Sequence, residues 1–296
     1  LVISYDSHRV YVRRNYIHDH VLYGHPDNLQ FHHDVYDIWY EDNAIINSGQ
    51  SCMMEAGYGI HFINNIIAAS GGYMLHTGNP STDIELRNNT MALSGYGLFG
   101  VRDTIIGLNF QNNIFYHGHS KLVWGVAPVN QYTGDYNLFF QGPGLSANDV
   151  VGWNGTWMSV ASFATGSGQD AHSFYADPQL ANVPAYWIQL ESDDIPLFTT
   201  NMVSVAEYDS LFAVGDHIEF DFDGVLRTIT AKNGRWLTFE PALDEPLLLG
   251  GCVANWKTKT NNVLDFTPVT GSPALGAGPE GMNIGSSVNL AQYRQG

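Results

Sequence analysis

Short runs of alternating apolar and polar residues fill the first half of the chain, and one block within them recurs at a nearly constant interval. Each copy has an alternating run, a polar pair that ends in asparagine, and then a mostly apolar stretch. The asparagines of four clear copies, Asn43, Asn65, Asn89 and Asn113, stand 22, 24 and 24 residues apart, and a fainter copy is centred on Asn15. Alternation suits strands and a repeat of this length suits a solenoid, so the pattern predicts one turn of a parallel β-helix per copy.

In a coil of this type each turn lies about 4.8 Å from the next, so equivalent residues stack in columns. Asparagine accepts the left-handed backbone conformation at a bend between strands, and its side-chain amide can bond the amides of the turns above and below. An asparagine in every turn suits a scaffold better than a single active centre. We therefore predict a structural asparagine ladder.

Motifs in the second half of the chain make the predicted fold more specific. They are NNIFYHG, GDYNLFF, a Trp-containing stretch with a short helix expected from Met158 to Ala164, GQDAHSFYADPQL, and a closing GSPALGAG. This pattern resembles the C-terminal half of secreted right-handed parallel β-helix proteins in the pectate-lyase-like superfamily. The resemblance implies an all-β fold and a polysaccharide ligand, but no single reaction, because this scaffold carries lyases, hydrolases, epimerases and phage tailspikes.

We expect three segments: a parallel β-helix over residues 1–194, an inserted small antiparallel β-barrel or sandwich over 195–256, and a C-terminal β-helix return and tail over 257–296. The insertion has alternating strands around two hairpin turns, Asp223-Gly224 and Asn233-Gly234. Trp236 and Trp256 are candidates for stacking on sugar, although core packing is the expected role of both.

The charge balance limits the class of partner. Twelve Lys and Arg against 29 Asp and Glu give a formal net charge of −17, and no basic run appears. We therefore expect neither nucleic acid nor a membrane surface as a partner, and no apolar run is long enough to span a membrane. The same deficit means that an enzyme acting on a polyuronate would need a few well-placed arginines or a bridging divalent cation.

The two cysteines lie far apart in the sequence. Cys52 stands in an apolar strand, which predicts a buried free thiol, and neither cysteine supports a zinc site. The chain starts directly on a strand-like Leu-Val-Ile-Ser, so we expect earlier turns and any secretion signal to lie outside it. The resemblance implies a secreted, extracellular protein.

The binding groove of a β-helix runs along one outer face, so polar groups that interrupt the apolar strands are the candidates for function. The densest segment is HPDNLQFHHD at residues 25–34. Alternation places Asn28, Gln30 and His32 on the face opposite its apolar residues. HPDN-x-Q resembles the H-x-D-x-(I/L)-Q turn of several β-helix enzymes that act on uronic-acid polymers or related glycans, with Asn28 in place of the usual glycine.

The following turns add a carboxylate and an imidazole. Alignment on the asparagine bends stacks His32 or His33 with Glu55 and then His76, about 5 Å apart. A carboxylate between two imidazoles can fix a tautomer and hold a histidine near neutrality, as a general base requires. The alternative is that Glu55 and His76 face inward and satisfy each other as a buried pair.

Two reactions stay open at this point, and elimination is favoured because the Asp-rich motifs of the polygalacturonase family are absent. Elimination needs a base, donors for the developing charge and an acid. These roles fall to His32 or His76 as base, Asn28 and Gln30 as donors, and Tyr58 or Tyr23 as acid. Hydrolysis needs two carboxylates that flank the bond, and Asp27 with Glu55 is the available pair.

A calcium ion held by Asp27, Asp34 or Asp37 would compensate for the missing basic groove. A non-catalytic glycan-binding or tailspike-like structural protein is the alternative from another class. The predicted catalytic residues are His32, Glu55, His76 and Asp27. The predicted substrate-binding residues are His25, Asn28, Gln30, His33, Tyr58, Arg102 and Trp124.

Overall fold

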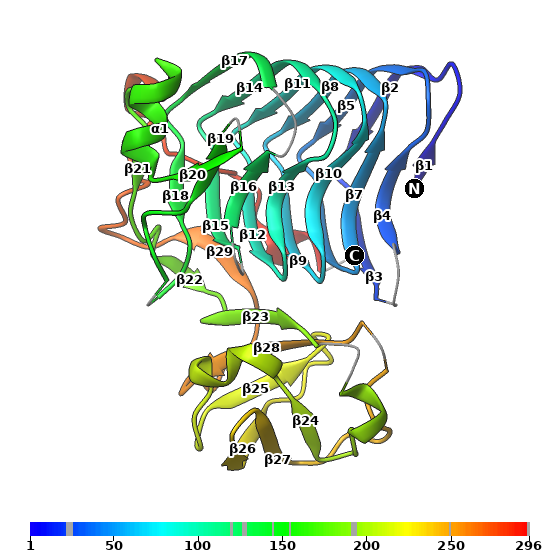
Figure 1. Ribbon diagram of the computed structural model, residues 1–296, viewed down its shortest axis with the longest axis vertical. Coiled ribbons are helices and arrows are strands. Elements are labelled where there is room, and N and C mark those ends of the chain that lie inside the picture. Colours follow the sequence, from blue (N-terminus) through cyan, green and yellow to red (C-terminus); the bar gives the residue numbers. More distant parts are fainter. Residues whose placement is uncertain are drawn as a thin grey trace.

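The computed structural model describes residues 1–21, 26–118, 121–125, 129–143, 145–153, 155–190, 194–248 and 250–294. The main body is a parallel β-helix of about 5 turns, built from three sheets that we name sheets A, B and C (Figure 1). Smaller antiparallel sheets lie in the C-terminal third. The all-β fold class predicted from the repeat is therefore confirmed.

Each complete turn of the coil contributes one strand to each sheet, and an antiparallel pair of strands ends sheet A. Sheet A contains β1 (Val2–Ile3), β4 (Asp27–Phe31), β7 (Gln50–Glu55), β10 (Tyr73–Asn79), β13 (Gly97–Val101), β16 (Lys121–Gly125), β19 (Val151–Trp153) and β20 (Thr156–Met158). Sheet B contains β2 (His8–Arg13), β5 (Val35–Glu41), β8 (Gly57–Ile63), β11 (Ser81–Arg87), β14 (Ile105–Gln111) and β17 (Val129–Asp135). Sheet C contains β3 (Tyr16–His20), β6 (Ala44–Ser48), β9 (Ile66–Ser70), β12 (Thr90–Ser94), β15 (Ile114–Gly118), β18 (Leu138–Phe140) and β21 (Phe174–Tyr175).

Columns of apolar side chains, one from each turn, fill the inside of the coil. On sheet A the strand register aligns Leu29, Cys52, Leu75 and Phe99, and all four side chains are fully buried. Burial of one such side chain is worth about 1.5–3 kcal/mol. The repeated column, more than any single contact, therefore holds successive turns together. Helix α1 (Val160–Ser167) follows the last turns, close to the helix predicted there.

The predicted asparagine ladder is present. Nδ2 of Asn43, Asn65 and Asn89 donates to Oδ1 of the asparagine one turn further on, at 3.0, 3.0 and 3.1 Å. The same oxygens accept the backbone N–H of the donor residue at 2.9 Å each. The last member, Asn137, donates to Oδ1 of the buried Asp170 at 3.0 Å. The ladder thus satisfies polar groups that burial would otherwise leave unpaired.

The left-handed bend falls on the residue before each ladder asparagine, which corrects the prediction that one residue does both jobs. The φ angles of Asp42, Asn64, Asn88 and Asn112 are 55°, 54°, 56° and 59°. Asparagine and aspartate tolerate this conformation better than other residues with a side chain. The paired asparagines of the repeat therefore have separate roles, the first at the bend and the second in the ladder.

An antiparallel sheet separate from the coil begins at Tyr186, before the start predicted for the insertion at residue 195. Its strands, in spatial order, are β23 (Tyr186–Gln189), β28 (Cys252–Lys257), β25 (His217–Phe220), β26 (Arg227–Asn233), β27 (Trp236–Glu240) and β24 (Met202–Ser204), with 3-10 helices η1 (Ile195–Leu197) and η2 (Ala206–Leu211) beside them. Both predicted hairpins are formed, because β26 pairs with β25 and with β27. Trp256 is fully buried and donates to Glu219 Oε2 at 2.9 Å, so its role is core packing.

The insertion and the C-terminal tail cover the outer face of sheet C. Trp187 is fully buried and donates from Nε1 to the Ser70 carbonyl at 3.0 Å, while Asn47 Nδ2 donates to the Asp221 carbonyl at 2.9 Å. The tail packs alongside with β29 (Asp265–Pro268), η3 (Pro279–Gly281) and α2 (Leu290–Tyr293). Strand β22 (Leu180–Asn182), which precedes the insertion, pairs with β29. In Figure 1 sheet A faces the viewer and the insertion lies beyond the lower ends of its strands. Exposed side chains on sheets A and B are therefore the ones that a ligand can reach.

Candidate functional site

Two columns of residues stand on the outer face of sheet A. The register aligns Gln30, Met53, His76 and Gly100 in the middle of the sheet. Two residues further along lies an edge column, which contains His32, Glu55 and Asn79, the register partner of Glu55. The register shifts between Thr77 and Asn79, and Arg102 follows Val101, the partner of Thr77.

His32 and Glu55 are in direct contact in the edge column. His32 Nδ1 lies 2.7 Å from Glu55 Oε2, and the two side chains are 33% and 27% exposed. A carboxylate at this position fixes the imidazole with its proton on Nδ1 and leaves Nε2 as the acceptor. The structure therefore brings together the first two members of the predicted column in the arrangement that a general base requires.

His76 does not join this pair, which corrects the predicted His–Glu–His column. His76 aligns with Met53, two residues before Glu55, and it is only 6% exposed. Its ring stacks on that of Tyr73 with centroids 4.6 Å apart. The error arose because His76 follows Asn65 by 11 residues whereas Met53 follows Asn43 by 10, so the intervening turn is one residue longer.

Asp27 and Asn28 also lie away from the pair. Asp27 aligns with Gln50 and, two residues before Leu29, lies on the same inward side of the strand. Burial raises the pKa of the Cys52 thiol, and the charge of Asp27 raises it further. Glu55 lies five residues beyond Gln50 on the opposite face, roughly 16 Å away. The Asp27–Glu55 pair predicted for hydrolysis is thus too far apart. Asn28 is fully buried.

The remaining predicted substrate-binding residues divide between two faces. Tyr58 is 48% exposed but belongs to β8, where it aligns with Tyr36 on sheet B. Gln30 is partly exposed on sheet A, and His33 is exposed next to His32. Trp124 lies on β16 opposite Gly100, but its side chain falls outside the described part of the chain. His25 and Tyr23 fall outside the described residues altogether.

The predicted calcium site is not assembled. Among the described residues no group of three or more His, Cys, Asp or Glu side chains is placed to hold a metal ion. Asp34 is exposed at a left-handed position, whereas Asp37 lies on β5 and accepts a hydrogen bond from Trp39 Nε1 at 2.7 Å.

Sheet B carries a second set of polar groups that the sequence analysis missed. His61 stacks on Trp39 with ring centroids 3.8 Å apart, and its Nδ1 lies 2.9 Å from Glu85 Oε2. The hydrogen bond from His61, with a smaller effect of Arg87, lowers the pKa of Glu85 despite its partial burial. Residues 39, 61, 85 and 109 each stand four positions before a ladder asparagine, so the repeat itself contained the signal.

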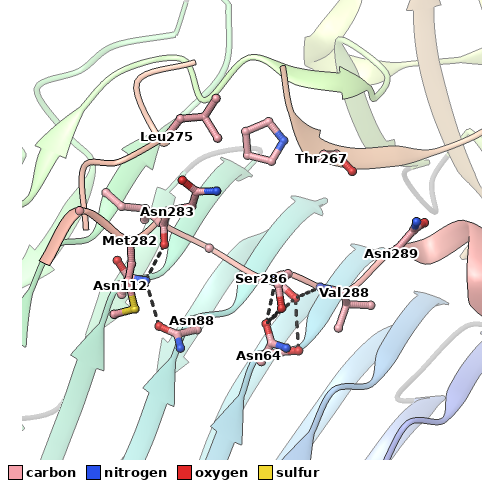
Figure 2. Close-up of a pocket in the computed structure, with 15 residues that line it drawn as sticks. Asn64, Asn88, Asn112, Thr267, Leu275, Met282, Asn283, Ser286, Val288 and Asn289 are labelled. Carbon is pink, nitrogen blue, oxygen red and sulfur yellow. Dashed lines mark hydrogen bonds between the residues drawn. The ribbon is translucent and has the colours of Figure 1, made fainter. Parts of the chain in front are cut away.

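A cleft with a volume of about 790 Å³ lies beneath the tail (Figure 2). Its wall consists of the bend asparagines Asn64, Asn88 and Asn112. Asn112 Nδ2 donates to Asn88 Oδ1 at 2.9 Å and to the Asn283 carbonyl at 2.8 Å. Side-chain amides on this side therefore hold the tail against the coil. We call this contact between coil and tail the seam, and we assign it a structural role.

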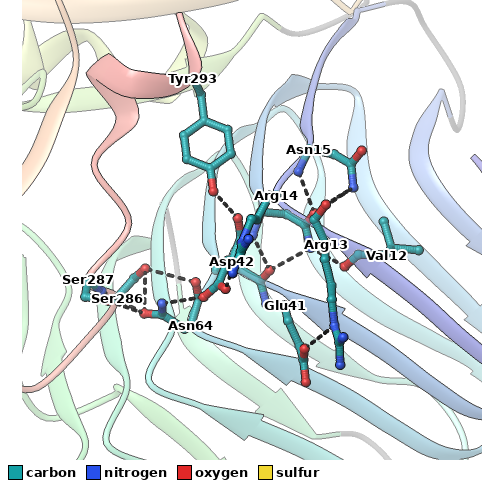
Figure 3. A network of polar contacts seen from close by, with 12 residues as sticks. Val12, Arg13, Arg14, Asn15, Glu41, Asp42, Asn64, Ser286, Ser287 and Tyr293 are labelled. Carbon is teal, nitrogen blue, oxygen red and sulfur yellow. Dashed lines mark hydrogen bonds and ion pairs between the residues drawn. The ribbon is translucent and has the colours of Figure 1, made fainter.

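The same seam continues toward the N-terminal turns (Figure 3). Asn64 Oδ1 accepts the Ser287 N–H at 2.7 Å, and the Tyr293 hydroxyl donates to the Asp42 carbonyl. An ion pair between Arg13 and Glu41, 2.5 Å apart, borders the network. These contacts tie the last helix to the first turns and leave no reactive constellation among the residues drawn.

No protein-family model, curated protein or solved structure matches this chain. The parallel β-helix therefore rests on the structure itself, and the likeness to the pectate-lyase-like superfamily stays a prediction. No helix within the described residues is long and apolar enough to cross a membrane.

Proposed function

We propose that the chain cleaves an acidic polysaccharide by β-elimination on the outer face of sheet A, outside the cell. The observation that carries the proposal is the 2.7 Å contact between His32 Nδ1 and Glu55 Oε2, with both side chains partly exposed. Glu55 orients the imidazole, and His32 Nε2 is then available to accept a proton from a substrate lying across the strands.

In the proposed reaction His32 Nε2 removes the proton on the carbon next to the carboxylate of a uronic acid. The electron pair of the broken C–H bond moves into the carboxylate as an enolate, and its return forms a carbon–carbon double bond as the glycosidic C–O bond breaks. The departing oxygen takes a proton, a role that we assign to the exposed neighbour His33. Tyr58, one of the two acids predicted from sequence, stands on sheet B and is excluded from this step.

The enolate needs positive charge or hydrogen-bond donors close to it. Arg102 is exposed and directly follows β13, a strand of the same sheet as those next to His32 and Glu55. Three strand spacings, about 14 Å, separate the backbones of His32 and Arg102, so their long side chains can approach one substrate from two sides. Gln30, partly exposed in the middle of the sheet, supplies a further amide donor.

Hydrolysis is less well supported because its two predicted carboxylates face opposite sides of sheet A. A non-catalytic glycan-binding or tailspike-like role is the alternative from another class, and it predicts no product from any polymer. Elimination, hydrolysis and binding give different products: an unsaturated uronide that absorbs ultraviolet light, new reducing ends alone, or neither. The proposal therefore predicts a product that absorbs ultraviolet light.

The test is incubation of the protein with a panel of polyuronates and neutral polysaccharides, following absorbance and reducing ends together. His32→Ala and Glu55→Gln should each lower the rate about 100-fold or more, and Arg102→Ala should do so on acidic substrates only. His172→Ala is the matched control. His172 Nδ1 lies 2.8 Å from Asp135 Oδ2, and Asp135 belongs to sheet B, not to sheet A. Reducing ends without absorbance, or no product from any polymer, would overturn the proposal.

A further inference from the structure

The outer face of sheet B carries a continuous column of aromatic and polar side chains, which we call the sheet B column. The strand register aligns one residue from each turn: Tyr11, Trp39, His61, Glu85, Asn109 and Thr133. Five spacings of about 4.8 Å give a length of about 24 Å along the coil axis. This length fits an extended oligomer better than a single small molecule.

The N-terminal part of this face is aromatic. Tyr11 and Trp39 stack with ring centroids 6.2 Å apart, and Tyr11 is 51% exposed. A parallel column on the same face contains His8, Tyr36 and Tyr58, of which the two tyrosines are 43% and 48% exposed. A gathering of exposed aromatic rings on the surface of a folded protein marks an interaction site more often than chance exposure.

Between the two columns runs a line of left-handed residues, one per turn. Asp37, Gly59, Asp83, Gly107 and Gln131 have φ angles of 59°, 62°, 55°, 76° and 61°. A Cβ added to Gly107 would lie 2.4 Å from Asp83 Oδ1. The Asp83 carboxylate can therefore lie across this line only because residue 107 is a glycine.

A hollow of about 310 Å³ opens at the C-terminal end of the aromatic rings. Its polar lining includes His61, Asp83, Glu85, Asn109 and Gln131. The volume is at the lower end of the range for small-molecule sites, about 300–1,000 Å³. Ile84 and Leu108 supply the apolar part of its lining, and apolar walls with a few convergent polar groups are the usual composition of such sites.

The polar groups of the hollow are mainly hydrogen-bond acceptors. Asp83 is exposed, and Asn109 Oδ1 is buried without a hydrogen-bond partner among the described residues. Glu85 is held by His61 at 2.9 Å and by Arg87 at 3.2 Å. Hydroxyl groups are the natural donors to such acceptors, whereas the carboxylates of a polyuronate would be repelled by Asp83 and Glu85.

We propose that sheet B binds a neutral glycan chain laid along the coil axis, with its pyranose rings against the aromatic residues and its hydroxyls on Asp83, Glu85 and Asn109. This site is separate from the proposed elimination site on sheet A and does not depend on its chemistry. The protein would then hold a neutral polymer on one face while it acts on an acidic one at another.

Isothermal titration calorimetry tests the proposal with three probes: a β-1,4-linked glucose hexaose, a mannose hexaose and a galacturonate trimer. The whole chain should bind at least one neutral hexaose, and Trp39→Ala and Glu85→Gln should each weaken that binding about tenfold or more. Tyr58→Ala should also weaken this binding. Tyr96→Ala is the control and should not weaken it, because Tyr96 is 58% exposed but directly precedes β13 of sheet A. Thermal unfolding of each variant confirms that it is folded.

Two outcomes would overturn the proposal: no neutral hexaose binds the intact protein, or binding is unchanged in both Glu85→Gln and Tyr58→Ala. The nearly isosteric Glu85→Gln keeps the test decisive if Trp39→Ala does not fold. His32→Ala separates this site from the proposed function, because it should abolish elimination and leave binding of the neutral hexaose unchanged.

Discussion

His61 Nδ1 lies 2.9 Å from Glu85 Oε2, one turn further along the coil. This imidazole–carboxylate contact resembles that of His32 with Glu55, but the sheet B pair is less exposed, at 20% and 22%. Arg87 lies 3.2 Å from the other oxygen of Glu85 and forms an ion pair with it. We therefore place the base on sheet A and a binding role on sheet B.

The His61–Glu85 contact predicts a pH-dependent contribution to stability. Its hydrogen bond lowers the pKa of Glu85 below 4.5 in the folded protein. The contribution is therefore present above the unfolded pKa and is lost as pH falls through the folded one. Glu85→Gln should lower the free energy of unfolding by about 1 kcal/mol at pH 7, and the difference should shrink toward pH 3. Urea unfolding at several pH values measures it, and a constant difference would contradict the assignment.

The coil could be predicted from the sequence because the same pattern of residues recurs in successive turns. Asn43, Asn65 and Asn89 each bond the next ladder member, as predicted. The sequence could not show that Asn64 and Asn88 form the bends and not the ladder, since asparagine suits both a left-handed bend and an amide stack. Local spacing predicts that a bend exists, but hydrogen bonding between turns decides which residue forms it.

Substitutions in the paired asparagines should therefore have unequal effects. Asn89 is fully buried, and its amide donates to Asn113 Oδ1 at 3.1 Å and to the Phe62 carbonyl at 2.7 Å. Asn89→Ala leaves several buried groups unpaired and should cost about 4 kcal/mol. Asn88→Gly keeps the left-handed backbone accessible and should cost about 1 kcal/mol or less. Denaturant unfolding compares them, and equal losses would refute separate roles.

The candidate site was only partly predictable because its geometry depends on the lengths of turns. His32 and Glu55 both follow aligned inward residues, so alternation sufficed to pair them. Tyr58 was placed on the wrong face because the chain turns into sheet B directly after Ala56, whose φ of 67° has no signal in the sequence. Alanine is not a residue from which a left-handed corner is predicted.

The two cysteines should be chemically silent in the folded protein. Cys52 and Cys252 are free and buried, as predicted for Cys52, and burial raises the pKa of both thiols. The reactive thiolate is therefore scarce and shielded. A chromogenic disulfide reagent should modify neither thiol at pH 8 in buffer and both in concentrated guanidinium. Rapid modification of the native protein would contradict the burial of the thiols.

Asp221 should make the insertion more stable in mild acid. Its carboxylate accepts the Cys252 N–H at 2.7 Å, yet burial raises its pKa from 3.8 to about 6. A raised folded pKa means that the stabilising contribution is fully present below the unfolded value and is lost as pH rises through about 6. Asp221→Asn removes the charge and keeps an acceptor, so it should stabilise the protein by about 2 kcal/mol at pH 8 and have little effect at pH 4. Thermal unfolding at both pH values is the measurement, with the exposed Asp265→Asn as control. Equal shifts of Tm at pH 4 and pH 8 would show that the carboxylate is not strained by burial, and that the junction between the insertion and sheet C tolerates its charge.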